Sequence, residues 1–381
     1  MAISRRRSTG QRILISHVAF AVAAALVGCG DDETAAGPTG GGGTGTAATG
    51  GQGGTPTGTS TGIGGQGGSG TGTGTGGTTG AWRAFNDQSP WNTPIGADPA
   101  IDPDSDALIA DFATSSTWPF LGINIASYGI PVFWADSSTP MANVDTTGLG
   151  GEGFHDQNPT PVPIPAGAAP DPDSDGHMCI IDRALGTEWG FWQASHVSGS
   201  DWNCSVCATA DLNGTGVRPP KDGNQDWWLS HGSRACGFPL IAGLITVDEM
   251  QAGRIEHALV IAYPHIRSRY YTPPASTAQG TTTEALPSRG IPCGGRIQLD
   301  PSLDLSTLGL TPSGLIIAQA LQEYGAFVGD YSGAMSLYAD GSAQAQAVWD
   351  GGLLGTYEVR DQIDLTDFRV LQIGQLYDDN N

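Results

Sequence analysis

The sequence predicts a mainly β domain at residues 81–381, of the β-sandwich or jelly-roll type with a few short helices. Short apolar or alternating runs recur along residues 119–370 and are bounded by Gly, Pro, Asp and Asn, which is the pattern of strands. Helical signals are confined to a few short segments. Because the strands follow one another with only isolated helices between them, packed sheets are favoured over alternating β-α units.

Several segments are predicted to be strands because each is short and apolar and is closed by turn-forming residues. In chain order they are residues 120–125, 130–134, 177–181, 187–193, 255–263, 296–299, 326–328, 335–338 and 368–373. The tripeptide Ala184-Leu185-Gly186 stands between two of them and predicts a hairpin at that point.

Helices are predicted from their capping signals, over residues 104–112, 246–253 and 312–324. Thr246 and Glu249 have the spacing of a capping box, and Gly253 suits the left-handed position that ends a helix. Pro312 suits the first helical position, and Gly325 ends that helix.

Residues 1–28 have the organisation of an export signal. Arginines in the first twelve residues precede an apolar run over residues 13–27, which is too short and too rich in alanine for a permanent membrane helix. The run ends in Leu26-Val27-Gly28-Cys29, which resembles the lipobox of bacterial lipoproteins. The resemblance implies cleavage before Cys29 and a lipid anchor on that residue. The alternative is an ordinary signal peptide in which Cys29 is incidental.

Residues 29–80 follow as the lipidated cysteine and a linker of mostly glycine and threonine, a composition that stays flexible and cannot bury a core. Such a tether reaches roughly 40 Å. Gly30, rather than an aspartate, follows Cys29 and favours the outer membrane of a cell that has two. We therefore expect a protein of the cell envelope that is anchored to a membrane by lipid and faces outward.

Charge and motifs exclude several classes of function. The chain carries 38 acidic against 16 basic residues, a net charge of −22, which repels the phosphate backbone of nucleic acids. A phosphate-binding glycine loop, a Gly-x-Ser-x-Gly elbow and a His-Glu-x-x-His zinc helix are all missing from the sequence. Nucleic acid and nucleotides are therefore not expected as partners.

Five cysteines lie in the predicted domain, at positions 179, 204, 207, 236 and 293. In an oxidising compartment this odd number predicts two disulfides and one free thiol. Cys204 and Cys207 have the spacing of redox and zinc sites, and a structural disulfide is favoured over a metal site because no second pair accompanies them.

The most distinctive local motif is an acidic loop in which Asp171, Asp173 and Asp175 alternate and Gly176 follows. Alternate carboxylates on a tight loop suit a hard cation, and Asp182 stands at the twelfth position, where calcium loops supply a last carboxylate. The sequence therefore predicts calcium bound by these four aspartates. The alternative is a solvated acidic turn.

His177 and His257 are the candidate catalytic residues, because each lies on the more apolar face of a predicted strand. One is expected to act as a general base and the other to orient or protonate a departing sugar. Glu188 is a reserve acid, expected beside Trp192. In the alternative account both histidines are buried, hydrogen-bonded core residues.

Tryptophans are the candidate contacts to substrate. The chain has 10 of them, and flat aromatic faces beside carboxylates suit sugar rings. Trp192, Trp227 and Trp228 are expected to form a wall of the site, together with Arg254. Packing of loops is the competing explanation.

These observations favour an enzyme that processes extracellular polysaccharide, as a lyase or as a glycoside hydrolase. A lyase needs a histidine or tyrosine base beside a cation, and the negative charge repels polyuronates unless calcium or arginines reverse it locally. A hydrolase needs two carboxylates. The alternative is a non-catalytic carbohydrate-binding or adhesin module.

Overall fold

The computed structural model describes residues 81–221, 226–279 and 290–379, all of which belong to one compact unit. The expected signal peptide, Cys29 and the linker lie outside the described residues. Within the described part of the chain, no helix has both the length and the apolar character needed to cross a membrane.

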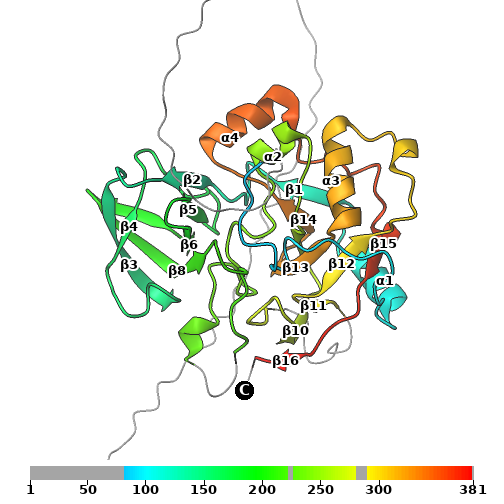
Figure 1. Ribbon diagram of the computed structural model, residues 1–381, viewed down its shortest axis with the longest axis horizontal. Coiled ribbons are helices and arrows are strands. Elements are labelled where there is room, and N and C mark those ends of the chain that lie inside the picture. Colours follow the sequence, from blue (N-terminus) through cyan, green and yellow to red (C-terminus); the bar gives the residue numbers. More distant parts are fainter. Residues whose placement is uncertain (1–80, 222–225, 280–289, 380–381) are drawn as a thin grey trace, which may run out of the picture. The chain divides into compact units, whose positions relative to one another are not determined.

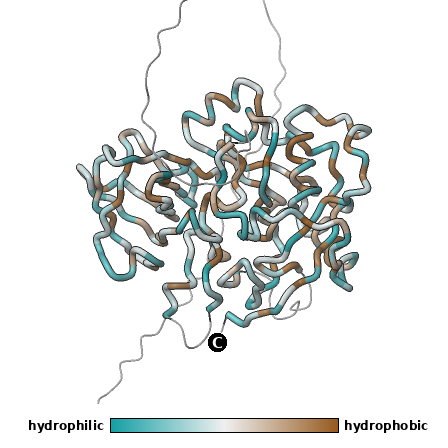
Figure 2. Tube along the Cα trace, in the orientation of Figure 1, coloured by the Kyte–Doolittle hydropathy of each residue, from teal (hydrophilic) through white to brown (hydrophobic). Residues whose placement is uncertain are grey.

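The domain is mainly β, as predicted, and is consistent with the sandwich type (Figure 1). Over the described ranges, three sheets of six, three and seven strands account for most of the regular structure, and the helices are few and short. Apolar residues occur in short stretches along the whole described chain, not in one long segment (Figure 2).

The first sheet has the order β1-β14-β9-β13-β12-β15. Its strands are β1 (Leu121–Asn124), β14 (Met335–Tyr338), β9 (Leu259–Tyr263), β13 (Ala326–Tyr331), β12 (Arg296–Leu299) and β15 (Phe368–Val370). Every residue of β9 and β14 is buried, as expected for strands covered on both faces. Helix α3 (Pro312–Glu323) contacts β12, and α1 (Ser105–Thr114) contacts β15.

The second sheet has the order β2-β5-β6-β8-β3-β4, with β7 paired to β8. Its strands are β2 (Val132–Ala135), β5 (Met178–Asp182), β6 (Thr187–Trp192), β8 (Asp201–Asp211), β3 (Met141–Gly150), β4 (Thr160–Pro163) and β7 (Ser195–Ser198). The predicted hairpin is confirmed by the antiparallel pairing of β5 with β6. A carboxylate oxygen of Asp182 closes its turn by accepting hydrogen bonds from the backbone N–H groups of Ala184 (2.8 Å) and Leu185 (3.0 Å).

The third sheet is small and has the order β11-β10-β16. Its strands are β11 (Pro292–Cys293), β10 (Arg267–Tyr271) and β16 (Tyr377–Asp378). Through β16 the C-terminal segment pairs in antiparallel fashion with β10.

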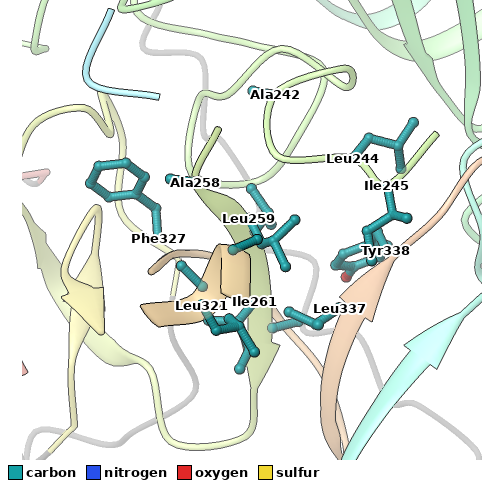
Figure 3. Packing of buried hydrophobic residues seen from close by; sticks show 14 of the residues in the cluster. Ala242, Leu244, Ile245, Ala258, Leu259, Ile261, Leu321, Phe327, Leu337 and Tyr338 are labelled. Atoms are coloured by element: carbon teal, nitrogen blue, oxygen red, sulfur yellow. The ribbon is translucent and has the colours of Figure 1, made fainter. Parts of the chain in front are cut away.

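Two hydrophobic clusters form the core. The larger one joins the first sheet to the helices, and in Figure 3 side chains of β9 and β14, such as Leu259, Ile261 and Leu337, lie among those of neighbouring elements. The smaller one belongs to the second sheet and includes Val144 and Phe191. The backbone of Val132 on β2 donates to the Asp340 carboxylate (3.1 Å), just after β14. The strands of the two sheets are thus tied at this point.

The capping predictions for the second and third helices are confirmed, whereas Asp104, at the start of α1, makes no side-chain capping bond. In α2 (Val247–Ala252) the Glu249 carboxylate accepts hydrogen bonds from the backbone (3.1 Å) and the hydroxyl (2.7 Å) of Thr246. Gly253 ends this helix at φ +79°, a conformation that costs glycine little. Pro312 begins α3, and Gly325 with φ +67° follows its end.

The cysteine prediction is confirmed as well. Cys204 is bonded to Cys207 and Cys236 to Cys293, while Cys179 is a buried free thiol. The second disulfide joins the loop after η1 (Trp227–Leu229) to β11.

Some strands differ from the prediction. β3 and β8 were not expected, because their sequences are polar and contain several small residues. The segment 255–263 is a strand only from Leu259 onward, because the backbone N–H of Ala258 bonds to Trp91 O instead of a neighbouring strand. Parallel pairs such as β9 with β13 and β2 with β5 were not expected either.

Candidate functional site

Five side chains from separate parts of the chain form what we call the Asp330 cluster. Asp175 and His177 precede β5, and Arg234 lies in the loop after η1. Asp330 and Tyr338 lie at the C-terminal ends of β13 and β14. The charge of Arg234 acts on each of the other four side chains. The cluster therefore combines residues from the first and second sheets.

Arg234 is at the centre of the cluster and is only 1% exposed. Its Nη1 lies 3.9 Å from Asp330 Oδ2, and its Cζ lies 4.5 Å from the centre of the Tyr338 ring. Its Nη2 donates to the carbonyl of Leu240 (3.2 Å). A buried guanidinium needs such partners, because an isolated charge in the interior is very costly.

The carboxyl group of Asp330 has a strongly raised pKa. Burial raises its pKa to about 7, with Arg234 opposing the shift and Asp175 adding to it. The Tyr338 hydroxyl also hydrogen-bonds the Asp330 side chain. At neutral pH this group is therefore divided between its protonated and ionised forms, as a proton donor requires.

Asp175 is the second carboxylate and is half-buried. Its Oδ1 accepts a hydrogen bond from Trp192 Nε1 (3.5 Å), and its backbone carbonyl accepts one from Gln193 (2.8 Å). Burial raises the pKa of Asp175, against the effect of the Trp192 bond. A tryptophan thus accompanies a partly exposed carboxylate at the end of β6.

His177 belongs to the cluster but is 3% exposed. Burial, assisted by the positive charge of Arg234, lowers its pKa to about 3. Among the described residues its Nδ1 has no hydrogen-bond partner. A histidine with this pKa is neutral at pH 7 and takes up a proton poorly, so this environment does not favour the general-base role predicted for it.

His257 has different partners. Its Nε2 lies 2.8 Å from Glu249 Oε1, and its Nδ1 lies 2.9 Å from its neighbour's carbonyl, Ala258 O. Burial lowers the pKa of His257, but the Glu249 carboxylate and these bonds outweigh burial and raise it overall. His257 lines a cavity of about 20 Å³ together with Trp91 and Asn92. The interactions of the described residues do not bring His257 into contact with the Asp330 cluster.

Glu188 is fully buried and holds the loop that carries Arg234. Its two carboxylate oxygens accept hydrogen bonds from the backbone N–H groups of Leu240 (2.8 Å) and Ile241 (3.1 Å). Burial raises its pKa. Gly190 permits this close approach, since a Cβ there would lie 2.0 Å from Ser233 Oγ. The contacts of Glu188 are those of a structural anchor; Trp192, beside which it was expected, bonds Asp175.

The predicted calcium ligands are only partly brought together. The Asp171 carboxylate accepts from Asp173 N (3.2 Å), and the Asp173 carboxylate accepts from Tyr128 N (2.9 Å). Burial and the neighbouring charge of Asp173 raise the pKa of Asp171 to about 6. Asp182 lies at the opposite end of β5, seven residues after Asp175. Seven residues of extended chain span roughly 20 Å. Within the described ranges, no three His, Cys, Asp or Glu side chains are arranged to hold a metal. Calcium binding stays a prediction.

Trp227 and Trp228 belong to another group of rings. His155 stacks on Trp228 with ring centres 5.0 Å apart, and His231 Nδ1 lies 2.6 Å from Trp227 O. Trp227 is 40% exposed. These residues form an exposed aromatic surface, whereas Trp192 is the predicted tryptophan that meets the Asp330 cluster.

Arg254 lies on the surface in a pair of salt bridges. Its guanidinium lies 2.7 Å from Glu323 and 3.1 Å from Glu256. Both partners neutralise its charge, and neither belongs to the Asp330 cluster. Its predicted contact with substrate stays a prediction.

Sequence reasoning missed Arg234, Asp330 and Tyr338. Asp330 follows the predicted strand 326–328, and Tyr338 ends the predicted strand 335–338. A polar group at the end of a buried strand is a signal that could have found them. Arg234 had a weaker signal, its position two residues before Cys236. Its partners are distant in sequence and could not be inferred from spacing.

The cluster contains two carboxyl groups, a phenol, a neutral imidazole and a guanidinium. Such a group can bind a polar ligand and move protons, because its carboxyl groups titrate closer to neutrality than ordinary aspartates. Comparison of the chain with models of protein families, with curated proteins and with solved structures finds no match.

Proposed function

We propose that this domain is a glycoside hydrolase that acts on extracellular polysaccharide, with the Asp330 cluster as its reaction centre. One observation carries the proposal: two carboxyl groups with raised pKa values, Asp175 and Asp330, face one buried guanidinium. Glycoside hydrolysis uses a pair of carboxyl groups, one protonated and one ionised.

The roles follow from the two environments. Asp330, with a pKa of about 7, is the general acid that protonates the departing oxygen. The hydrogen bond that Asp175 accepts from Trp192 favours its ionised form, so Asp175 is the base or the nucleophile. We expect the half-buried Trp192 to contribute its ring to the sugar contact.

Hydrolysis is preferred to elimination because the cluster offers no good base for a lyase. Burial raises the pKa of Tyr338 far above its ordinary value, and it lowers the pKa of His177 to about 3. Arg234 is too deeply buried to neutralise a uronate carboxylate. The acidic chain, at −22, also repels polyuronates.

A binding module without catalysis is the second candidate. The exposed aromatic surface of His155, Trp227 and Trp228 favours it, because such rings stack on sugars without chemistry. This candidate expects retention on polysaccharide with no change in chain length.

The experiment that separates these functions is incubation of the purified protein with a panel of polysaccharides. Hydrolysis releases reducing ends without the ultraviolet absorbance of the unsaturated sugar that a lyase forms. Asp175→Asn is expected to lower the rate by about 10²–10⁴-fold, the range of acid–base catalysis. Asp201→Asn, at the exposed start of β8, is the matched control and should retain the rate. An active Asp175→Asn variant would contradict the assignment.

We also propose that Cys29 carries a lipid that holds the protein on the outer membrane, facing outward. The support is the lipobox-like Leu26-Val27-Gly28-Cys29 and the linker that follows it. Cys29→Ser is expected to move the protein from the membrane fraction to the soluble fraction of lysed cells. A variant that remains with the membrane would contradict the anchor.

A further inference from the structure

Three aromatic side chains from two segments of the chain form what we call the Trp118 surface. Trp118 and Phe120 lie directly before β1, and Tyr357 lies in the turns that follow η3 (Trp349–Leu353). The centre of the Phe120 ring lies 6.0 Å from that of Trp118 and 5.6 Å from that of Tyr357. Both pairs meet edge to face, an arrangement that aromatic rings prefer. The three rings therefore form one continuous group.

The Trp118 surface is open to solvent. Trp118 is 58% exposed and Tyr357 is 57% exposed, more than any other tryptophan or tyrosine in the part of the chain that the structure describes. A single exposed apolar side chain is ordinary, whereas a continuous exposed group of them marks a binding surface. Exposure and continuity together therefore indicate that these rings meet a partner.

Hydrogen bonds of the backbone hold the rings in place before any ligand binds. Trp118 N donates to Ser116 Oγ (3.0 Å), and Phe120 N donates to the carbonyl of Trp118 (2.9 Å). The two segments are tied to each other, because Ile123 N on β1 donates to the carbonyl of Thr356 (2.9 Å). A ligand on such a prearranged surface does not lose affinity to the ordering of loops.

The charged groups at the Trp118 surface are of both signs. The Arg360 guanidinium lies over the ring of Phe120, with Cζ 4.5 Å from the ring centre, and its Nε lies 3.6 Å from a carboxylate oxygen of Asp361. Arg360 thus occupies the place above this ring that a cationic ligand would need. The exposed Asp361 carboxylate and the net charge of −22 repel anionic ligands. The surface is therefore best suited to a ligand without charge.

Neutral sugars fit these features better than a second copy of the chain does. Their apolar ring faces can pack on Trp118 and Tyr357. Their hydroxyl groups both donate and accept hydrogen bonds, so they suit Arg360 and Asp361 at the edge of the surface. A second copy would bring another net charge of −22 to the contact, and like charges oppose association.

The Trp118 surface lies away from the proposed reaction centre. β1 pairs in parallel with β14, with Leu121 opposite Met335 and Asn124 opposite Tyr338 (Figure 1). Trp118 precedes the first of these pairs in the chain, whereas Tyr338 of the Asp330 cluster belongs to the last. The two locations are thus at opposite ends of the same pair of strands.

We propose that the Trp118 surface binds a neutral polysaccharide and holds it on the domain without cleaving it. The inference goes beyond the proposed function, since binding on this surface requires no reaction and no residue of the Asp330 cluster. A polymer held in this way stays near the reaction centre between cleavage events.

The test is electrophoresis of the purified protein through gels that contain a neutral glucan, a neutral mannan or polygalacturonate, relative to a gel without polymer. At least one neutral polymer is expected to retard the wild type. Trp118→Ala and Tyr357→Ala should each weaken this binding by about two- to tenfold, the range of one aromatic contact. Tyr357→Phe keeps a ring and should bind as the wild type does.

Trp134→Ala is the matched control, because Trp134 is a tryptophan on β2 that is 43% exposed, and this variant should be retarded normally. Each variant is also made together with Asp175→Asn, so that cleavage of the gel polymer is not mistaken for weak binding. Normal retardation of both alanine variants, no retardation of the wild type by a neutral polymer, or a preference for polygalacturonate would overturn the inference. Loss of retardation in Trp227→Ala alone would move binding to the surface of His155, Trp227 and Trp228 and would overturn it as well.

The proposed function and the Trp118 surface fail in different ways. If the two alanine variants weaken retardation but the wild type cleaves no polymer, binding at the Trp118 surface stands and hydrolysis is wrong. If polymer is cleaved while both alanine variants are retarded normally, hydrolysis stands and binding at the Trp118 surface is wrong.

Discussion

His177 and His257 occupy similar positions, each buried and each shortly before a strand, but their surroundings differ. His257 has a carboxylate at 2.8 Å, which keeps its pKa above the ordinary value. His177 has the cation Arg234 near it and a nitrogen without a partner among the described residues, and its pKa falls to about 3. Both ring nitrogens of His257 thus lie within hydrogen-bonding distance of other protein atoms. Nδ1 of His177 has no such partner among the described residues.

This difference separates a structural pair from a candidate site. Removing one partner of a buried ion pair destabilises the fold, because the other charge is left buried and unpaired. A group of titratable residues with shifted pKa values and unmet bonds is where function is expected. We therefore place chemistry at the Asp330 cluster and assign His257 with Glu249 to stability.

His257→Asn should have the largest effect on folding. It leaves the Glu249 carboxylate buried without its cation, a change that costs about 3–5 kcal/mol of unfolding free energy. Chemical denaturation below pH ~6.5, where the imidazole is charged in both states, measures this loss. Hydrolysis by the folded variant should be unchanged.

His196→Asn is the control for that experiment, because His196 is exposed and should change stability by less than about 0.5 kcal/mol. If His257→Asn is as stable as the wild type but loses turnover, the structural role assigned to His257 is wrong and His257 is catalytic.

The dependence on pH should distinguish the histidines more finely. The raised pKa of His257 stabilises the fold below its unfolded value of about 6.5, and this contribution is lost as pH rises through the folded value. The lowered pKa of His177, about 3, has the opposite sign: its contribution is present above pH ~6.5 and is lost as pH falls toward 3.

As pH falls below about 6.5, the stability difference between wild type and His177→Asn should therefore shift in favour of the variant. The deficit of His257→Asn should instead be greatest in acid and should shrink as pH rises. Melting temperatures across this range test both trends. Parallel curves for the two variants would show that the two environments do not differ.

Calcium should have the smallest effect. If Asp171, Asp173 and Asp175 bind it, the ion stabilises the folded state by mass action and raises the melting temperature of the wild type. Asp173→Ala should lose this response, whereas Asp87→Ala, at an exposed aspartate near the start of the domain, should keep it. A similar response in wild type and Asp173→Ala, or none in either, excludes the site.

Local features of this fold could be predicted from sequence because they depend on neighbours. The β5–β6 hairpin needs only its apolar runs and the turn at Ala184–Gly186, and the start of α2 needs Thr246 and Glu249 at the right spacing. The same is true of Pro312 at the first position of α3.

The candidate site was harder to predict because its members come from four separate segments. Asp175 and His177 were identified from the acidic loop, but nothing in the spacing places Arg234 or Asp330 beside them. Parallel pairing of β9 with β13 and of β1 with β14 brings together strands that are far apart in sequence. His257 was predicted to act together with His177 because both lie on predicted apolar strands. In the structure the two histidines have different neighbours, Glu249 and Arg234.

The pH dependence of kcat/KM for hydrolysis tests the central claim most directly. If Asp330 is the general acid, the rate of the wild type should fall on the alkaline side of about pH 7, as its carboxyl group ionises. Asp330→Asn should remove this limb and lower kcat/KM by about 10²–10⁴-fold, with the fold intact. A variant that keeps both the wild-type rate and the alkaline limb would contradict the account.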